Sequence, residues 1–319
     1  MAAHRILTLT LNPALDVSTS VPHLYPHEKL RCAPPVYTPG GGGINVARTI
    51  RRLGGEALAL FPVGGTTGAH LLELLEAEGI PCQAVPVAGW TRECINLTNQ
   101  ADDQQYRFVL PGNPLSSQEQ AALLSTLETL PPAEFLVISG SLPEELATDF
   151  LPRLLKSAQQ RGSRCVVDST GNALRQMLDC GGLLLIKPNL DELAAMAGEP
   201  IAGPEHLTQV AWDLVAAKRT EAVLVSLGAQ GALLVTAEVC ERIPAPTVPR
   251  RSTVGAGDSL LAGMVLKRAS GACWQEAARY GVAAGTAAIM AEGSRLSRRE
   301  DTERLYSWLT GNPSPTEPT

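Results

Sequence analysis

The sequence lacks several features that would define other classes of protein. No uninterrupted apolar run approaches the roughly 20 residues of a membrane-spanning helix. The N-terminal apolar stretch, interrupted by Asn12 and Asp16, is too short for a signal-peptide core. The seven cysteines include no C-x-x-C pair, and the five histidines show no metal-ligand spacing. A net charge of -6 disfavours binding to nucleic acid. We therefore expect a cytoplasmic protein with reduced thiols that binds neither membranes nor nucleic acid.

Apolar residues make up 45% of the 319 residues, enough to bury a sizeable core. Strand-like apolar runs alternate with helix-like ones along the chain, at 57–63 and 70–80, 135–141 and 150–160, 165–169 and 173–178, and 183–189 and 191–197. Such alternation predicts an α/β fold with a doubly wound, mostly parallel sheet. We expect residues 1–310 to form one domain and residues 311–319 to be a disordered tail.

Two regions do not fit this alternation. Residues 22–39 are rich in proline, and residues 83–110 are strand-like with little helical signal. We expect segments of about 17–39 and 88–110 to form a small β-sheet that acts as a lid. The first strand, expected over residues 6–11, leads into a loop that carries Asp16.

The segment 252–259, STVGAGDS, places small residues directly before an apolar helical pattern. Backbone N–H groups at such a helix start are free to bind an anion. An aspartate there, Asp258, could take a proton from a hydroxyl that attacks a bound phosphoryl group. On the pattern alone, an alternative is equally open: Asp258 caps the helix and the glycines only make the turn.

Two further motifs have both a functional and a structural interpretation. The run GGGGIN at 40–45 lets backbone approach a ligand, but it fits neither the Walker A pattern nor G-x-G-x-x-G, because Asn45 occupies the last place. It could simply be a flexible loop before a helix. In KPNLDE at 187–192, Asn189 and Glu192 share one face of a helical turn and could hold Mg²⁺ through oxygen atoms. Alternatively, they form a capping box.

Six motifs occur in a set order: Asn12-Pro13 followed by Asp16, GGGGIN, SGSLP at 139–143, KPNLDE, SLGAQGAL at 226–233 and TVGAGDS at 253–259. Together they resemble the ribokinase/phosphofructokinase-B family of sugar kinases, over residues 4–310. The resemblance implies that family's ribokinase-like fold. Within the family, TLTLNPALD and SGSLP are similar to the phosphosugar branch, and the stretch 25–45 is most similar to its minor-type bacterial 6-phosphofructokinases, since the other members usually carry Lys in place of Gly42.

The resemblance implies ATP-dependent phosphorylation of fructose 6-phosphate at O1, with 1-phosphofructokinase and tagatose-6-phosphate kinase as alternatives. It implies that Asp258 is the general base and that the amides of Gly255, Ala256 and Gly257 oppose the charge of the transferring group. The implied substrate-binding residues are Asp16, Lys29, Arg31, Gly41, Gly42, Gly43, Asn45, Arg92 and Ser141. The implied nucleotide-binding residues are Lys187, Asn189, Ser226, Gly228, Gly231 and Ala284. The implied Mg²⁺ ligands are Glu192 and Asp168, and the implied K⁺ site comprises Ser252, Val254 and Gly293.

The resemblance also implies a homodimer built on the lid, with Lys29 and Arg31 reaching the sugar phosphate. Two residues depart from the pattern of the minor-type enzymes: Asn12 is more similar to the 1-phosphofructokinases, and Arg250 stands where a smaller polar residue is usual. Two other functions are alternatives. A sugar-phosphate-binding regulator would need a damaged catalytic centre, whereas Asp258 is present. An NAD-dependent oxidoreductase would need the missing G-x-G-x-x-G.

Overall fold

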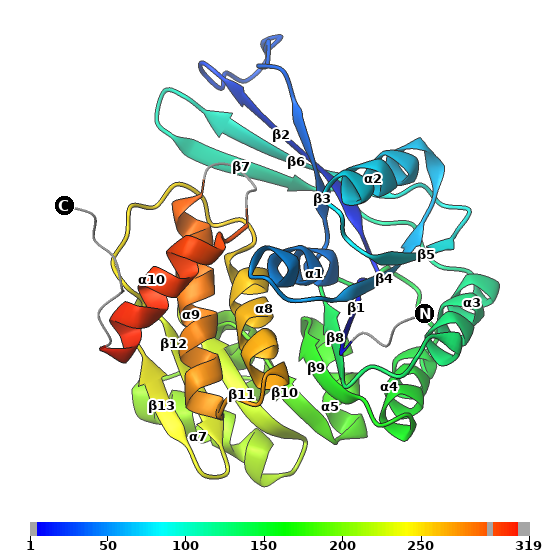
Figure 1. Ribbon diagram of the computed structural model, residues 1–319. Coiled ribbons are helices and arrows are strands. Elements are labelled where there is room, and N and C mark those ends of the chain that lie inside the picture. Colours follow the sequence, from blue (N-terminus) through cyan, green and yellow to red (C-terminus); the bar gives the residue numbers. More distant parts are fainter. Residues whose placement is uncertain (1–4, 292–295, 312–319) are drawn as a thin grey trace.

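A large twisted sheet of nine strands forms the centre of the molecule (Figure 1). The computed structural model describes residues 5–291 and 296–311. Across the sheet the strands are β13 (Cys240–Ile243), β12 (Ala232–Thr236), β11 (Thr220–Ser226), β10 (Leu183–Ile186), β9 (Arg164–Asp168), β8 (Phe135–Ser139), β1 (Ile6–Leu9), β4 (Leu58–Val63) and β5 (Cys82–Pro86). Seven of these strands, from β11 to β5, are parallel, and β12 and β13 complete the sheet as antiparallel strands. The predicted α/β class with a mostly parallel sheet is confirmed.

The order of the strands reverses beside β1. From β1 the chain proceeds through β4 to β5 on one side, and then returns to build β8, β9, β10 and β11 on the other side. Loops that follow strands on the two sides of such a reversal diverge and leave space at the carboxyl ends of the strands. The topology therefore predicts a ligand site at the carboxyl ends of β1 and β8 and their neighbours.

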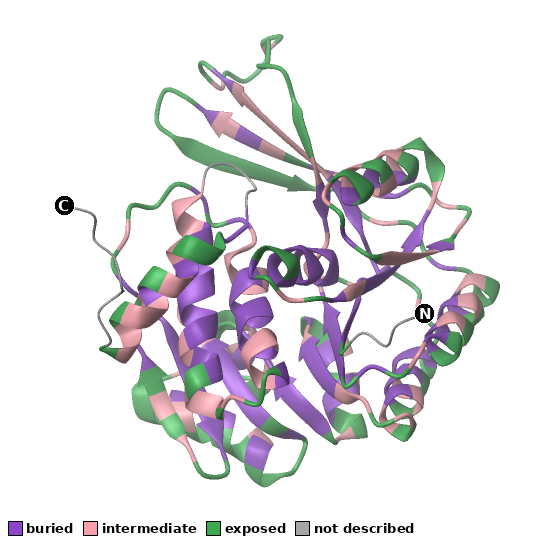
Figure 2. Cartoon of the chain, viewed as in Figure 1, coloured by how far each residue is buried: buried purple, intermediate pink, exposed green. Residues whose placement is uncertain are grey.

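Helices cover both faces of the large sheet. They are α1 (Gly42–Arg52), α2 (Gly65–Ala77), α3 (Ser117–Thr129), α4 (Phe150–Gln160), α5 (Gly171–Cys180), α6 (Leu190–Ala197), α7 (Pro204–Ala216), α8 (Ala256–Ala269), α9 (Trp274–Met290) and α10 (Arg299–Thr310). Side chains alternate along each strand, so that Leu136 and Ile138 pack with α3 to α5, whereas Phe135 and Val137 pack with α1 and α8. Both faces are thus buried (Figure 2). Among the described residues, no helix is both long and apolar enough to cross a bilayer.

A second sheet of four strands projects from one edge of the molecule (Figure 1) and corresponds to the predicted lid. Its order is β3 (Val36–Gly40), β2 (Ala14–Val21), β6 (Arg92–Asn99) and β7 (Gln104–Val109). We call it the lid sheet. One expectation is wrong: Asp16 lies within strand β2 and not in a loop, because β2 pairs with β3 and β6 from Ala14 onward.

Candidate active site

The predicted site residues follow the carboxyl ends of adjacent strands. Asn12 comes after β1, Ser141 after β8, Asp168 ends β9, Lys187 comes after β10 and Ser226 ends β11. Parallel strands end at the same edge of a sheet, so motifs that are far apart in the sequence meet at this edge. The start of α1 and the start of α8 complete the site from one face of the sheet.

Asp258 lies in the first turn of α8 and does not cap that helix. The N-cap residue is Gly255, whose φ of 73° is in the left-handed region, and no side chain caps the turn. The Oδ2 atom of Asp258 instead accepts a hydrogen bond of 2.9 Å from Nδ2 of Asn45, on α1. The Ala256 amide donates a long hydrogen bond of 3.4 Å to the backbone oxygen of Thr253. The turn nevertheless presents backbone N–H groups that no side chain caps, and these suit an anion beside this carboxylate.

Burial and charge together make Asp258 a stronger base than an exposed aspartate. Burial, and next the negative charge of Asp168, raise its pKa from an ordinary value of 3.8 to about 6, although Asn45 and Lys187 oppose this shift. Lys187 is itself buried and forms an ion pair of 3.1 Å with Asp168. Burial alone would lower the pKa of Lys187, but Asp168 and its neighbours raise it overall, so the ammonium stays charged. A fixed cation beside a carboxylate of moderate pKa suits transfer of an anionic group.

The second half of the site lies where the lid sheet joins the large sheet. Burial raises the pKa of Asp16 to about 6, against the lowering effect of three arginines, Arg107, Arg48 and Arg92. Gly40 packs directly on the Asp16 carboxylate, since a Cβ atom at this glycine would lie 2.5 Å from Oδ1. Arg92 donates a hydrogen bond of 3.0 Å to Ser141 Oγ and another to the backbone oxygen of Asn12. Three predicted substrate residues, Asp16, Arg92 and Ser141, are therefore gathered here.

The glycine run is required by close backbone packing. A Cβ atom at Gly42 would lie 2.3 Å from Ser139 Oγ, and one at Gly43 would lie 2.7 Å from the backbone oxygen of Leu9. Thr10 Oγ1 accepts a hydrogen bond from the Ile44 amide and so closes the first turn of α1. The run is thus a rigid contact between α1 and the ends of β1 and β8, which argues against a flexible loop.

A cavity of about 150 Å³ adjoins the start of α8. Its lining includes three predicted nucleotide residues, Ser226, Gly228 and Gly231, and two residues of the predicted anion hole, Ala256 and Gly257. Its far wall is formed by Gly285 and Thr286 of α9. Ala284, also predicted to bind the nucleotide, is buried with Leu53 and Tyr280, and its neighbour Gly285 lines the cavity instead, because successive residues of a helix point in different directions. The role of Ala284 stays a prediction.

The predicted magnesium residues are placed differently from one another. Asn189 and Glu192 form the capping box that the sequence left open, with reciprocal hydrogen bonds of 2.8 Å. Asp168 is held by Lys187 and by Ser139. No group of three or more His, Cys, Asp or Glu residues that could hold a metal occurs within the described residues. This set fits an ion that arrives with phosphate oxygens and keeps its waters, as Mg²⁺ does.

The remaining predicted residues lie at the margins of the site. Ser252 and Val254 belong to the loop before α8, where Ser252 Oγ accepts a hydrogen bond from the Val254 amide. Gly293 lies outside the described residues. Lys29 and Arg31 are exposed on the connection between β2 and β3. In the described structure, no hydrogen bond or ion pair joins either of them to another predicted residue.

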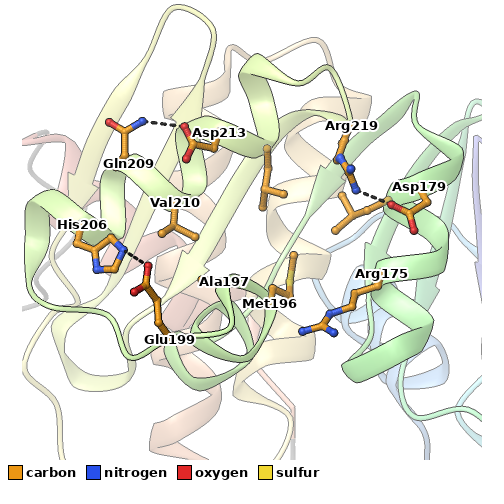
Figure 3. Close-up of a pocket in the computed structure, with 12 residues that line it drawn as sticks. Arg175, Asp179, Met196, Ala197, Glu199, His206, Gln209, Val210, Asp213 and Arg219 are labelled. Carbon is orange, nitrogen blue, oxygen red and sulfur yellow. Dashed lines mark hydrogen bonds and ion pairs between the residues drawn. The ribbon is translucent and has the colours of Figure 1, made fainter.

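A cavity of about 420 Å³ between α5, α6 and α7 contains none of the predicted residues (Figure 3). Its polar side chains have partners within or beside the cavity: Arg219 pairs with Asp179, His206 contacts Glu199, and Gln209 donates to Asp213. The motifs and the largest pKa shifts of the aspartates belong instead to the site beside α8.

Three residues that are absent from the predicted set also contribute to the site. Ser139 contacts both Asp168 and the glycine run, and Thr286 lines the cavity beside α8. Arg48 is fully buried between α1, α2 and the lid sheet. Ser139 begins the SGSLP motif, whereas nothing in the local pattern distinguishes Arg48 or Thr286, since polar Asn45 and Thr49 share the segment 44–50 with Arg48.

The fold and the site define an α/β protein whose predicted site residues gather between a lid sheet and the starts of two glycine-preceded helices. The pattern of the pfkB family of carbohydrate kinases matches residues 11–301. The chain belongs to this family, which confirms the resemblance.

Similar proteins extend over nearly the whole chain. ATP-dependent 6-phosphofructokinase isozyme 2 of Escherichia coli K12 is 45% identical over 306 residues, covering 96% of this chain and 99% of that protein. The isozyme 2 of Mycobacterium tuberculosis H37Rv is 40% identical, covering 95% and 89%. The crystal structure of E. coli phosphofructokinase-2 with fructose 6-phosphate has a TM-score of 0.92 at 44% identity, covering 96% of this chain and 99% of that one.

Two further structures of the E. coli protein bear on ions and assembly. One is described as a complex with potassium and the other as a tetrameric inhibited form. Their TM-scores are 0.93 and 0.91 at 46% and 44% identity, and each covers 96% of this chain and 99% of that chain.

Proposed function

We propose that this protein transfers the γ-phosphoryl group of ATP to O1 of fructose 6-phosphate, giving fructose 1,6-bisphosphate and ADP. The observation that carries this proposal is the position of Asp258. It lies between the cavity beside α8 and the group formed by Asn45, Asp16 and the glycine run. The similarity to 6-phosphofructokinases over 96% of the chain supports fructose 6-phosphate as the acceptor.

The reaction follows from the groups at the start of α8. The Asp258 carboxylate accepts the proton of the sugar O1 hydroxyl while that oxygen forms a bond to the γ-phosphorus. The bond between the γ-phosphorus and the bridging oxygen of ADP breaks, and ADP leaves. The amides of Gly255, Ala256 and Gly257 donate hydrogen bonds to the transferring group. Lys187 adds a fixed positive charge nearby, since a Cβ atom at Gly257 would lie 3.4 Å from its Nζ atom.

The nucleotide and its ions would occupy the region around β10 and β11. Ser226, Gly228 and Gly231 would hold ATP in the cavity beside α8. Asp168 and Glu192, with Asn189, would hold Mg²⁺ through its waters, and the ion would neutralise phosphate charge. The backbone of the loop with Ser252 and Val254 would hold K⁺. A cytoplasmic location is part of the same proposal, supported by seven free cysteine thiols.

The sugar phosphate would lie on the other side of Asp258. Asp16, Asn45 and the backbone of Gly41, Gly42 and Gly43 would bind the sugar hydroxyls. Ser141 and Arg92 would bind the 6-phosphate, since the arginine guanidinium suits paired phosphate oxygens. Lys29 and Arg31 would reach the sugar phosphate that is bound in the neighbouring subunit.

The proposal is tested by ADP production from ATP and Mg²⁺ with fructose 6-phosphate, fructose 1-phosphate and tagatose 6-phosphate as separate acceptors. We expect fructose 6-phosphate to have the highest kcat/KM. A preference for either of the other sugars would keep the phosphoryl-transfer chemistry and reject the acceptor. Absence of ADP with all three would reject the kinase.

An apolar face of the lid sheet supports a homodimer. In the strand register, Tyr37, Val17, Ile95 and Phe108 form one row across the sheet. Asp16 points to the opposite face, because neighbouring residues of a strand alternate. Phe108 is 48% exposed and Ile95 is 36% exposed. Exposed apolar rows of this kind mark interaction surfaces, and a second copy of the lid sheet would cover this one.

Phe108→Glu should therefore convert the dimer to monomers in sedimentation equilibrium, because each interface would bury two glutamates, one from each subunit. Val109→Glu is the matched control. Val109 is also exposed on β7 but lies on the opposite face, so this variant should remain dimeric. Monomeric wild-type protein, or dissociation by both variants alike, would contradict the proposed interface. A tetramer would indicate an additional contact.

A further inference from the structure

Arg48 is the largest fully buried side chain of the described structure, and its hydrogen bonds connect three parts of the molecule. Its Nε and Nη2 atoms donate to both carboxylate oxygens of Glu78, which follows α2, at 2.7 and 2.5 Å. Its Nη1 atom donates to the backbone oxygen of Pro39 at 2.9 Å and to Asn45 Oδ1 at 3.2 Å. The guanidinium is thus bound in a fixed orientation by groups of α1, α2 and the lid sheet.

Arg48 determines the orientation of the Asn45 amide. A guanidinium group can only donate hydrogen bonds, whereas an ionised carboxylate can only accept them. Asn45 lies between the two: its Oδ1 faces Arg48, and its Nδ2 faces Asp258. A flipped amide would direct its oxygen at the carboxylate and its NH₂ group at the guanidinium, losing both hydrogen bonds.

The same guanidinium holds the part of the lid sheet that carries the sugar-binding groups. Pro39, whose oxygen accepts from Arg48, immediately precedes Gly40, and Gly40 packs on the Asp16 carboxylate. Glu78 keeps the cation in place from the other side and has a side chain that is 29% exposed. Arg48 itself, 2% exposed, cannot touch a bound sugar or nucleotide.

We infer that Arg48, held by Glu78, is a positioning residue for phosphoryl transfer: it aligns the Asn45 amide so that Asn45 orients the Asp258 carboxylate toward the attacking hydroxyl. This inference rests on the proposed function. Arg48 acts on the chemical step through Asn45. None of Arg48, Asn45 and Asp258 lines the cavity beside α8, where ATP would bind. Loss of Arg48 should therefore lower kcat and leave the KM for ATP unchanged.

The test is a double-mutant cycle between Arg48 and Asn45, with kcat and both KM values measured well below each variant's unfolding temperature. Arg48→Lys keeps the positive charge but cannot donate to Glu78, Pro39 and Asn45 together. It should lower kcat about tenfold, the effect of one hydrogen bond. In the Asn45→Ala background, the same change should lower kcat by less than about twofold, because the amide through which Arg48 acts is gone. Arg51→Lys, an exposed change on the same helix, should alter nothing.

A second variant tests the inference even if Arg48→Lys fails to fold. Glu78→Gln leaves Arg48 in place and weakens only the contact of Arg48 with the partly exposed side chain at position 78. It should lower kcat about threefold, and this effect should also disappear with Asn45→Ala. Equal effects of Arg48→Lys or Glu78→Gln with and without Asn45, or a rise in the KM for ATP, would show a merely structural role and overturn the inference. Wild-type protein without turnover would instead overturn the proposed function.

Discussion

Replacing Asp258 with asparagine should lower kcat by about 10²–10⁴-fold, the usual contribution of a general base. The amide oxygen can still accept the hydrogen bond from Asn45, so the variant removes proton acceptance and preserves the local contact. The KM for ATP should change little, because Asp258 does not line the nucleotide cavity. Steady-state ADP production at saturating substrates measures the loss.

Two controls separate chemistry from folding in this experiment. Asp213→Asn changes a helical carboxylate that accepts a hydrogen bond from Gln209, and this variant should keep the wild-type rate. Asp258→Asn should unfold at no lower temperature than wild type at pH 8, since it removes a charge that burial disfavours. A folded Asp258→Asn protein with near-wild-type turnover would refute the base assignment.

The same assignment has a pH signature. Because the pKa of Asp258 is raised to about 6, its carboxylate is lost as the pH falls through this value, and the wild-type rate should fall with it. The pKa of Asp16 is also about 6, so this group contributes to the same acid limb. The residual rate of Asp258→Asn should therefore fall less steeply with pH than the rate of the wild type.

Arg92→Ala should raise the KM for fructose 6-phosphate about 10–100-fold, the loss expected for charged hydrogen bonds to a phosphate. The KM for ATP should stay unchanged. Arg92→Lys should recover only part of the loss, because an ammonium cannot donate two parallel hydrogen bonds. Arg153→Ala, which removes an exposed arginine on α4, serves as the control.

An unphosphorylated acceptor distinguishes phosphate binding from a structural role of Arg92, which also holds backbone oxygens of Asn12 and Leu110. With fructose at high concentration, Arg92→Ala and wild type should have similar kcat/KM values. An equal loss with fructose would show that Arg92 supports the fold of the site and does not recognise the phosphate.

Periodicity in the sequence predicted the alternating strands and helices of the large sheet, because burial on both faces leaves a strong apolar signal. Two helices were missed. Helix α3 begins with a capping box at Ser116 and Glu119, and α7 begins with Pro204, so the sequence carries a start signal for each of them. The proline before β2 predicts a loop at Asp16, whereas pairing with β3 and β6 begins strand β2 at Ala14.

By itself, the sequence determined the fold class, the family and the motifs that meet at the site, since local patterns and ordered motifs require no knowledge of distant contacts. Tertiary structure alone decided how these motifs act on one another. The ion pair of Lys187 with Asp168, the contact of Asn45 with Asp258 and the buried position of Arg48 each join residues from different elements. Such partners are brought together by the strand order and by helix packing, and the pKa of a carboxylate depends on the resulting burial and charge. No pattern along the chain records these distances.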